Sequence, residues 1–325
     1  MVKVGIIGCG KIAQVRHIPE YLDNPNAKLT GLYDLNLQRA KDLAEKYNCK
    51  SYESVEEMLA DPEIDAVSVC VANHVHAEIT IAALKAGKHV LCEKSITLNA
   101  EELEEAVRLA EEHHVVLAEA MTIFHMPIYK ELRSRMDTGE FGELRLLQMN
   151  FGSYKEYDMK NRFFNRNLAG GALLDIGVYA LSFLRWFMSS KPDQILSQVK
   201  YAPTGVDEQA SILLKNKEEE MATVILSLHA KQPKRGTISF DKAYIELFEY
   251  PRGEEAIITY TEDGHKEVVS VGSTDRALEY EVADMEVAVA GEENRMHLDY
   301  TIDVMDMMTA IRKDWGMRYP EEEEG

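Results

Sequence analysis

Short apolar runs alternate with longer amphipathic stretches over the first 120 residues. Apolar runs such as Val2–Ile7 are typical of strands that are buried on both faces of a sheet. The stretches between them carry helix signals, such as the capping residue Asn36 and the terminating Gly87. Strands separated by helices of this length predict right-handed crossovers and a parallel sheet. The predicted strands are 2–7, 29–33, 66–71, 89–92 and 115–118, and the predicted helices are 11–22, 36–47, 54–59, 75–85 and 99–114.

Beyond about residue 120 the pattern changes to a series of short strands. A helix is predicted at Ile128–Met136, an extended segment at Leu144–Phe151 and a strongly apolar helix at Gly171–Met188. A last helix is predicted at His297–Arg312, and the acidic tail Glu321–Glu324 is expected to be solvated and mobile. Between the last two helices, period-2 or apolar runs joined by short polar or Gly-containing links predict antiparallel meander strands. These runs are 210–214, 223–228, 244–248, 256–260 and 268–271.

The change of pattern predicts an α/β protein with two domains. Residues 1–120 are expected to form a dinucleotide-binding type of parallel sheet, and residues 121–325 an α/β domain rich in antiparallel strands. The length of 325 residues fits two domains at roughly 100–200 residues each. Because the chain shows no internal repeat and no low-complexity linker, we expect the two domains to pack together.

Charge and composition exclude several classes of protein. With 36 basic and 56 acidic residues, the formal net charge is 36 − 56 = −20, which argues against partners such as nucleic acids and anionic membranes. No apolar run approaches the roughly 18 residues of a membrane-spanning helix, and the N-terminus lacks a signal-peptide layout. The four cysteines form no Cys-x-x-Cys pair, so we expect neither a metal site nor a disulfide framework. These features predict a soluble, cytoplasmic protein.

A glycine-rich loop follows the first predicted strand and opens the first helix. The sequence Gly8-Cys9-Gly10-Lys11-Ile12-Ala13 has the G-x-G-x-x-G/A form of a dinucleotide fingerprint. Gly8 permits the tight turn, Gly10 lets the backbone approach a pyrophosphate, and Ala13 allows close packing of helix on strand. The N–H groups of the helix N-terminus would then bind the phosphates. The alternative is a glycine-rich turn without a ligand.

Asp34 ends the second predicted strand, 34 − 13 = 21 residues after Ala13. An acidic side chain at this place reaches the adenosine ribose hydroxyls. A carboxylate would repel a 2′-phosphate, so the sequence favours NAD, with NADP less favoured. Arg39, five residues further on, could weaken that preference. The alternative role for Asp34 is a helix cap.

Polar residues end the third and fourth clear strands, where ligands of open parallel sheets bind. Asn73 and His76 follow one strand, and Glu93 and Lys94 end the other. Lys94 is the strongest catalytic candidate, because a lysine near a cofactor can hydrogen-bond a substrate oxygen and stabilise developing negative charge. The alternative is a solvated surface lysine. His76 is expected to cap or pack the following helix rather than to contact substrate.

The apolar helix beyond residue 170 carries a second pair of polar candidates. Asp175 and Tyr179 are spaced i and i+4, so they share one face of a helix that is otherwise rich in Leu, Ile, Phe and Trp. A carboxylate on such a helix is costly unless it is paired or lines a site. Tyr179 could relay a proton, since a nearby Lys94 ammonium would lower its pKa. The alternative is a core tyrosine and a helix-start aspartate.

Taken together, these motifs resemble the Gfo/Idh/MocA family, the glucose–fructose oxidoreductase and inositol dehydrogenase group. Glu93-Lys94-Ser95 resembles the family's E-K-P signature, whose lysine lies in the active site. Residues 170–179, which end in Tyr179, resemble its G-G-x-L-x-D-x-G-x-H/Y element. Tyrosine at that position is similar to the branch that holds dihydrodiol dehydrogenase, xylose dehydrogenase and glucose–fructose oxidoreductase. Further resemblances are the loop 8–13, the segment 73–78, the crossover 119–127 and the turn 139–143.

Two residues depart from the family pattern. Ser95 stands where the family has proline, often with a cis bond, so the turn after Lys94 could relax or shift. Ile123 replaces an arginine, which removes a possible contact to substrate. The resemblance also implies a Rossmann domain joined to a domain with a large, mostly antiparallel open sheet, through which family members form dimers or tetramers.

The resemblance implies an NAD(P)-dependent oxidoreductase acting on a secondary alcohol or ketone of a sugar, polyol, cyclitol or diol. Tyr179 would exchange the hydroxyl proton, Lys94 would hold the oxygen, and Asp175 would orient the substrate or the lysine. We expect these three groups to converge from the two domains near the nicotinamide. The acidic chain favours an uncharged substrate. The alternative function is a dinucleotide-binding regulator or sensor without turnover.

Overall fold

The computed structural model describes residues 1–323, and the chain divides into two compact units. Unit 1 consists of Met1–Ala120 and Leu278–Leu298, and unit 2 consists of Met121–Ala277 and the residues from Asp299 onward. The first boundary falls at the predicted position. Sequence reasoning assigned residues 278–298 to the second domain, whereas they pack with the first unit.

Unit 1 contains a six-stranded sheet in which every neighbouring pair is parallel. The strand order β3-β2-β1-β4-β5-β6 reverses direction beside β1, as in a doubly wound dinucleotide-binding sheet. The predicted parallel sheet is thereby confirmed, apart from the short edge strand β3, which the sequence did not indicate. The strands are β1 (Val2–Ile7), β2 (Ala27–Tyr33), β3 (Lys50–Ser51), β4 (Ala66–Val69), β5 (His89–Glu93) and β6 (Leu117–Ala120).

Three helices of unit 1 begin at a capping side chain, including the predicted cap Asn36. The side chains of Asn36, Ser54 and Asn99 each accept a hydrogen bond from the backbone N–H three residues further on, which satisfies one of the free donors of the first helical turn. The helices are α1 (Ile18–Asp23), α2 (Leu37–Tyr47), α3 (Val55–Ala60), α4 (His76–Lys85), α5 (Ala100–His113) and α8 (Ala277–Val289).

Helix α8 explains why a distant segment belongs to unit 1. Its Val282 packs with Val4 and Ile6 of β1, and its Met285 packs with Leu91 of β5 and the alanines of β6. A right-handed crossover puts its helix on one face of the sheet when the chain moves outward in one direction, and on the other face when it moves outward in the opposite direction. In a sheet built outward from its middle, the crossover helices therefore cover opposite faces of the two halves. Helix α8 therefore supplies apolar cover for strands β4, β5 and β6 on the face that carries α1.

Unit 2 contains an eight-stranded sheet of order β14-β13-β12-β11-β7-β10-β9-β8. All neighbouring pairs are antiparallel except β7 and β10, which run parallel. The predicted mostly antiparallel sheet is confirmed, and two strands that the sequence pattern missed, β8 and β11, belong to it. The strands are β7 (Leu144–Gly152), β8 (Gln194–Tyr201), β9 (Asp207–Lys215), β10 (Met221–Ser227), β11 (Gln232–Phe240), β12 (Ala243–Phe248), β13 (Glu255–Tyr260) and β14 (Lys266–Ser270).

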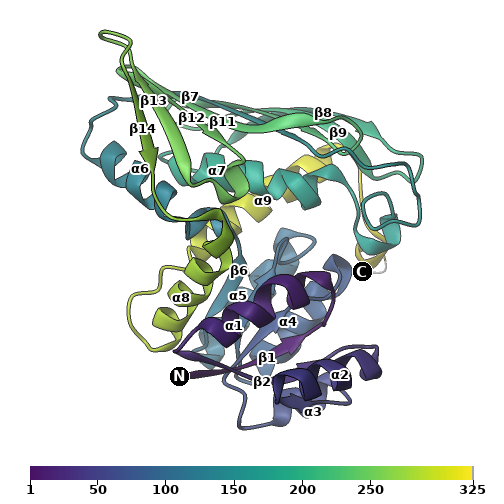
Figure 1. Cartoon of the computed structure of the whole chain (residues 1–325). Coiled ribbons are helices and arrows are strands. Elements are labelled where there is room, and N and C mark those ends of the chain that lie inside the picture. The colour runs from purple at the N-terminus through teal and green to yellow at the C-terminus, as the bar shows by residue number, and fades with distance from the viewer. Residues whose placement is uncertain (324–325) are drawn as a thin grey trace. The chain divides into compact units, whose positions relative to one another are not determined.

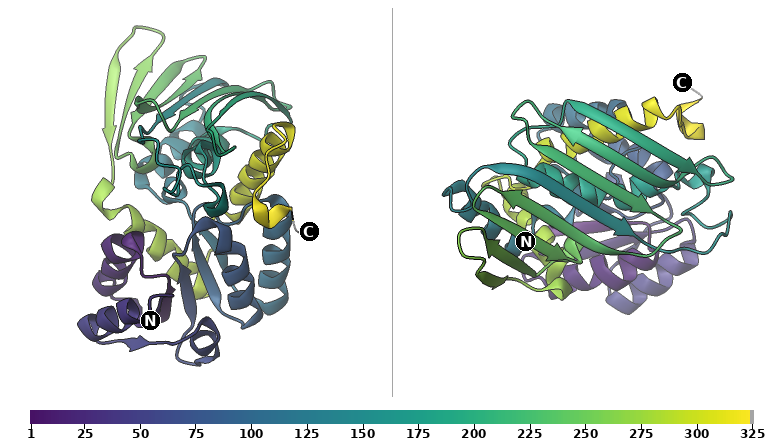
Figure 2. Two further views of the ribbon diagram at one scale, coloured as in Figure 1. Left: turned by 90° about the vertical axis from the view of Figure 1, so that its right-hand side faces the viewer. Right: turned by 90° about the horizontal axis from the view of Figure 1, so that it is seen from above.

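The helices of unit 2 lie on one face of this sheet, and Figure 2 shows the opposite face from above. They are α6 (Pro127–Asp137), α7 (Val178–Phe187) and α9 (Leu298–Asp314). Helix α7 directly follows a π-helical turn at Leu173–Gly177. It is the strongly apolar helix that the sequence predicts, and it lies against the sheet.

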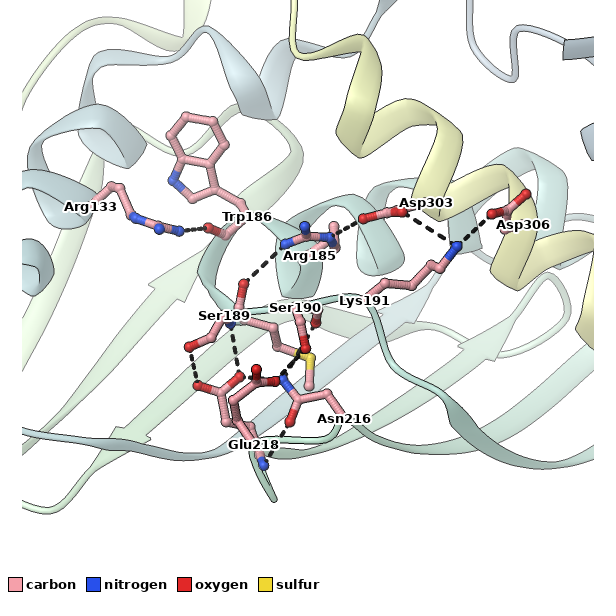
Figure 3. Close-up of polar contacts among 12 residues, drawn as sticks. Arg133, Arg185, Trp186, Ser189, Ser190, Lys191, Asn216, Glu218, Asp303 and Asp306 are labelled. Atoms are coloured by element: carbon pink, nitrogen blue, oxygen red, sulfur yellow. Dashed lines mark hydrogen bonds and ion pairs between the residues drawn. The ribbon is translucent and has the colours of Figure 1, made fainter. Parts of the chain in front are cut away.

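A polar network fixes the C-terminal end of α7 (Figure 3). Arg185 Nε lies 2.6 Å from Asp303 Oδ2 on α9, and Arg185 also donates to the carbonyl of Met188. Beyond the helix, the backbone N–H and hydroxyl of Ser189 donate to the carboxylate of Glu220 at 2.9 and 2.7 Å. The network ties α7 both to α9 and to the turn between β9 and β10.

Part of the acidic tail is ordered, contrary to the sequence-based expectation. Glu322 accepts two hydrogen bonds of 2.7 Å from the buried guanidinium of Arg312, and a third from the backbone N–H of Tyr319. A buried arginine is stable only with such a partner. Glu324 lies outside the described residues.

The helical segment Arg166–Phe187 is long and apolar enough to cross a membrane, as judged by its length and composition alone, and its most apolar window is 18 residues long. Sequence reasoning did not identify it. The protein itself buries 78% of that window, which is the behaviour of a core helix, so the hydropathy is explained by packing within unit 2.

Candidate functional site

The glycine-rich loop of unit 1 forms the tight turn that its sequence predicts. Gly8 has a positive φ of 94°, and a Cβ built on it would lie 2.7 Å from the carbonyl oxygen of Cys70. Only glycine accepts this conformation and this closeness. A Cβ on Gly10, by contrast, would meet no atom within 4 Å. The backbone at Gly10 is therefore open to a ligand, as the fingerprint requires.

Asp34 connects this loop to helix α2. Its carboxylate accepts hydrogen bonds from the backbone N–H of Cys9 at 2.8 Å and of Asn36 at 2.7 Å, and it lies 3.1 Å from the guanidinium of Arg39. The helix cap is Asn36 rather than Asp34, so the capping alternative does not apply. The carboxylate is instead held at the edge of the loop, with Arg39 beside it.

A pocket of about 330 Å³ opens next to these residues. Glutamine, asparagine and arginine side chains give it donors and acceptors, and Leu43 gives it an apolar wall. The loop with a free face at Gly10, the anchored acidic residue and this pocket fit the adenosine half of a nicotinamide dinucleotide. The lining residues are Gln14, Asn36, Gln38, Arg39, Asp42 and Leu43.

The ends of β4 and β5 are joined by His76. The residue is fully buried, with Nδ1 2.7 Å from the carbonyl oxygen of Ser95 and Nε2 3.1 Å from that of Val71. Burial lowers the pKa of His76, so the ring is neutral and donates one proton, for which the shorter contact to Ser95 is better placed. The histidine holds the residue that follows Lys94, a contact that the prediction of a capping or packing role on the following helix did not include.

The turn after Lys94 is fixed on both sides. The peptide bond between Lys94 and Ser95 is cis, so serine in place of the family's proline has not removed this configuration. Ser95 is buried, and the N–H of Ile96 donates to the buried carboxylate of Glu119 at 3.0 Å. Lys94 itself is only half-buried.

A contact that sequence reasoning missed lies just before Lys94. Glu93 Oε1 is 2.7 Å from Nε2 of His17 in the π-helical turn Ala13–His17, which follows the glycine loop. Burial raises the pKa of Glu93, but the contact to His17 outweighs it, and the net shift is downward. The pair connects the nucleotide loop to the strand end that carries Lys94. No local spacing signals it, since 76 residues separate the partners.

Asp175 and Tyr179 occupy a distinctive place in unit 2. Between residues 171 and 184 they are the two positions that are not fully buried. The π-helical turn Leu173–Gly177 contains Asp175, and such turns recur at functional sites. Arg162 lies 3.2 Å from Oδ1 of Asp175, and the ring of Phe151 lies 6.2 Å from that of Tyr179. The predicted pair therefore faces a partly open surface.

A buried carboxylate that sequence reasoning missed anchors the start of this helical segment. Asp207 is fully buried, and its Oδ2 accepts a 2.6 Å hydrogen bond from the N–H of Leu173. A Cβ at Gly171 would lie 2.0 Å from its Oδ1, which explains the glycine. Burial raises the pKa of Asp207 to about 7. The carboxylate caps the turn that carries Asp175.

Each unit brings together its own share of the predicted site residues. Unit 1 places the glycine loop with Asp34, and Glu93 with Lys94 and His76. Lys11 is exposed, and Ile12 packs partly against the core. Asn73 opens a short 3₁₀ turn at the end of β4. Unit 2 places Asp175 with Tyr179. The convergence of Lys94 with these two residues remains a prediction.

Two family models match the chain. The NAD-binding Rossmann-fold model of the oxidoreductase family GFO_IDH_MocA covers residues 2–121, and a model of the GFO/IDH/MocA C-terminal domain covers residues 129–246. The second match falls within the second predicted domain, and the first covers the first predicted domain from its second residue and ends one residue beyond it.

Comparisons with single proteins agree with these matches. The chain is 30% identical to a trans-1,2-dihydrobenzene-1,2-diol dehydrogenase of Xenopus tropicalis, over 75% of this chain and 74% of that protein. It is 31% identical to the human protein of the same name, over 76% and 73%. A 3-ketoreductase from Actinomadura kijaniata, solved with NADP and TDP-benzene, has the same fold, with a TM-score of 0.85, 23% identity and coverage of 96% and 97%.

Proposed function

The chain belongs to the Gfo/Idh/MocA family of NAD(P)-dependent oxidoreductases, and from that premise we propose that it transfers hydride between nicotinamide and a secondary alcohol or ketone. The substrate is a sugar, polyol, cyclitol or diol. Relatives named as a trans-1,2-dihydrobenzene-1,2-diol dehydrogenase and a dTDP-3,4-didehydro-2,6-dideoxy-alpha-D-glucose 3-reductase support this class.

The observation that carries the proposal is the pair Asp175 and Tyr179 on the core helix of unit 2. Both residues stay partly exposed, whereas the other residues between 171 and 184 are buried. The protein anchors this segment with Asp207 at its start and with the Arg185–Asp303 ion pair at its end. A polar pair held this firmly on an apolar helix suits substrate binding and proton transfer.

Three residues of this chain take part in the proposed reaction. Tyr179 takes the hydroxyl proton during oxidation and returns it during reduction. The Lys94 ammonium donates to the reacting oxygen and stabilises the phenolate form of Tyr179. Asp175 orients a substrate hydroxyl, and Arg162 pairs with that carboxylate at 3.2 Å. The bound dinucleotide supplies the hydride acceptor or donor.

The adenosine site supports both NAD and NADP. Sequence reasoning made NADP less favoured, because a carboxylate at Asp34 repels a 2′-phosphate. Arg39 lies within 3.3 Å of both oxygens of that carboxylate, so it offsets the negative charge and can turn to a phosphate at small cost. A relative of the same fold binds NADP. NADP is therefore not less favoured than NAD.

The rival function is a dinucleotide-binding regulator or sensor without turnover. A panel of sugars, inositols and diols, assayed with NAD and NADP in parallel, separates the two. Both functions predict that NADH or NADPH binds, but only the enzyme changes absorbance at the nicotinamide band with some member of the panel. Binding without turnover across the panel would favour the regulator.

The assembly and the setting of the protein are also part of the proposal. The uncovered face of the sheet in unit 2 exposes Leu196, Leu213, Met221 and Ile225 by 43–71%. Apolar patches of this kind mark contacts between proteins, so we expect a dimer or tetramer through this face. The free cysteines fit a reducing, cytoplasmic setting, and we expect partners such as nucleic acids or membranes to play no role.

A further inference from the structure

A group of aromatic side chains lies next to Asp175 on unit 2. The ring of Tyr154 stacks on that of His229, with centroids 5.2 Å and planes 25° apart. Tyr157 packs at 4.0 Å against His229 and at 5.0 Å against Phe164. We call Tyr154, Tyr157, Phe163, Phe164 and His229 the aromatic cluster. Its rings come from the segment that follows β7 and from the residue two positions after β10.

Backbone contacts hold these two segments together beyond the end of the sheet. The N–H of Ser153 donates to the carbonyl of Ser227 at 2.9 Å, and the N–H of Lys155 donates to that of Leu228 at 2.7 Å. The ring of His229 is fixed by a 2.9 Å contact between Nδ1 and the carbonyl oxygen of Lys155. The stack of Tyr154 on His229 is therefore built on an extended, hydrogen-bonded frame.

The same segment is bound to the helix that carries the candidate catalytic pair. The carbonyl of Phe163 accepts a 3.0 Å hydrogen bond from the N–H of Gly171. The guanidinium of Arg162 lies 4.3 Å over the ring of Phe163 and reaches Asp175 Oδ1 at 3.2 Å. A Cβ on Gly170 would lie 2.5 Å from the carbonyl of Arg162. The aromatic cluster thus borders Asp175.

Only part of the aromatic cluster is open to solvent. Phe164 is fully buried. The ring of Phe163 is covered by two cations, Lys155 with Nζ 4.5 Å from the ring centroid and the guanidinium of Arg162. Tyr154 and Tyr157 remain 54% and 43% exposed. An aromatic face left in water next to a polar binding group costs solvation free energy, and a bound apolar surface would recover it.

We propose that Tyr154, supported by His229, binds the apolar face of a six-membered ring and makes the enzyme prefer ring substrates to open-chain ones. This inference rests on the proposed function, because it places the reacting alcohol at Asp175 and Tyr179. A ring presents its C–H groups as one rigid, flat surface. An open chain must first lose the freedom of several bonds to offer the same surface.

The test compares two vicinal secondary diols of six carbons that differ in ring closure, trans-1,2-cyclohexanediol and 3,4-hexanediol. Tyr154→Ala is expected to lower kcat/KM for the cyclic diol about tenfold, which corresponds to about 1.4 kcal/mol, and to leave the open-chain diol within about twofold. Tyr154→Phe keeps the ring face and should keep the preference. Tyr201→Ala, a tyrosine of 42% exposure at the end of β8, is the matched control.

The inference would be overturned if Tyr154→Ala left the ratio of kcat/KM for the cyclic and the open-chain diol unchanged. Saturation-transfer NMR with methyl glucopyranoside gives a readout that needs no turnover. Ring C–H signals should appear with the wild type and with Tyr201→Ala and be lost with Tyr154→Ala. If neither diol is oxidised, the proposed function fails for these substrates, while signals that persist in Tyr154→Ala, or that are absent from the wild type, refute the ring-binding role.

Discussion

Asp207 is a buried carboxylate that binds the start of the helical segment carrying the candidate pair Asp175 and Tyr179. It accepts from the N–H of Leu173, and the hydroxyl of Tyr319 donates to the carbonyl of Gly170 beside it. Arg312 also faces it, but its guanidinium is bonded to Glu322. Burial outweighs these contacts and raises the pKa of Asp207 to about 7.

This pKa predicts how stability depends on pH. Between about pH 4 and pH 7 the folded protein holds a proton that an unfolded aspartate has released, so the stability due to Asp207 falls as pH rises through that window. Asp207→Asn removes the titration. From pH 5 to pH 8, the unfolding free energy of the wild type should fall by about 3 kcal/mol relative to the variant, as measured by urea denaturation.

Asp193→Asn is the control for this experiment, because it removes a carboxylate that is exposed to solvent rather than buried. A constant difference for Asp207→Asn across the same range would contradict this prediction, because it would mean that Asp207 is ionised in the folded protein throughout, as it is in the unfolded chain.

Arg39 is expected to set the preference between the two dinucleotides. Its guanidinium is 43% exposed and lies beside Asp34 at the rim of the adenosine pocket. Arg39→Ala should weaken NADPH binding about tenfold and NADH binding less than threefold, since one charge-assisted contact to phosphate is worth roughly 1.5–3 kcal/mol. Fluorescence titration measures both affinities. Lys41→Ala on the same helix is the control, and equal losses for the two dinucleotides would contradict the role.

At the scale of elements, local patterns predicted most helices and the buried strands. Val2–Ile7 and the cap at Asn36 were found because each signal lies within a few residues of the element it defines. Strand β11 was missed because its sequence Gln232–Phe240 contains Pro233, three further polar residues at its start and Gly236. It is a strand because β7 and β12 pair with it on either side.

The candidate site divides in the same way. The glycine loop, Lys94, Asp175 and Tyr179 could be identified from sequence, because motifs record them at fixed spacing. Asp207 and His17 could not, since their partners Leu173 and Glu93 lie 34 and 76 residues away. Long-range contacts of buried polar groups depend on how elements pack, which no local pattern encodes.

The ion pair at the end of α7 gives a prediction for that element. Arg185 and Asp303 are 12% and 20% exposed, so removing one partner leaves a poorly solvated charge. Arg185→Met should lower the unfolding free energy by about 2 kcal/mol, and adding Asp303→Leu should recover part of the loss. Arg108→Met, which removes an exposed contact to Glu112 outside this network, should cost less than about 1 kcal/mol.

These values are measured by denaturant unfolding of the single and double variants. If the double variant is as unstable as the sum of the Arg185→Met and Asp303→Leu changes, the two residues do not act as a pair.

At the scale of the whole molecule, the chain builds its first unit from two distant segments. Residues 278–298 complete a unit that otherwise ends at Ala120, and Met285 and Met296 pack with Leu91. The helical pattern of this segment was missed because its apolar residues do not gather on one face. Unit 1 therefore depends on a chain that passes through unit 2 and back.

The exposed face of the large sheet predicts the state of assembly. Leu213 is 51% exposed and lies opposite Leu196 on the neighbouring strand. Leu213→Asp puts a charge in this apolar patch and should convert the oligomer to monomers, as measured by light scattering coupled to size exclusion. Leu22→Asp, an exposed leucine of unit 1, should leave the mass unchanged. A wild-type protein that is monomeric at high concentration would contradict the proposal.

The most direct test of the central claim is the rate of hydride transfer by the wild type, Lys94→Ala and Tyr179→Phe, measured across pH on the best substrate of the sugar and diol panel. The account predicts that Lys94→Ala lowers kcat/KM at least about 10²-fold, because it removes the group that stabilises charge on the reacting oxygen. Tyr179→Phe should lose a similar factor while binding dinucleotide as the wild type does. Wild-type turnover by Tyr179→Phe at every pH would contradict the account.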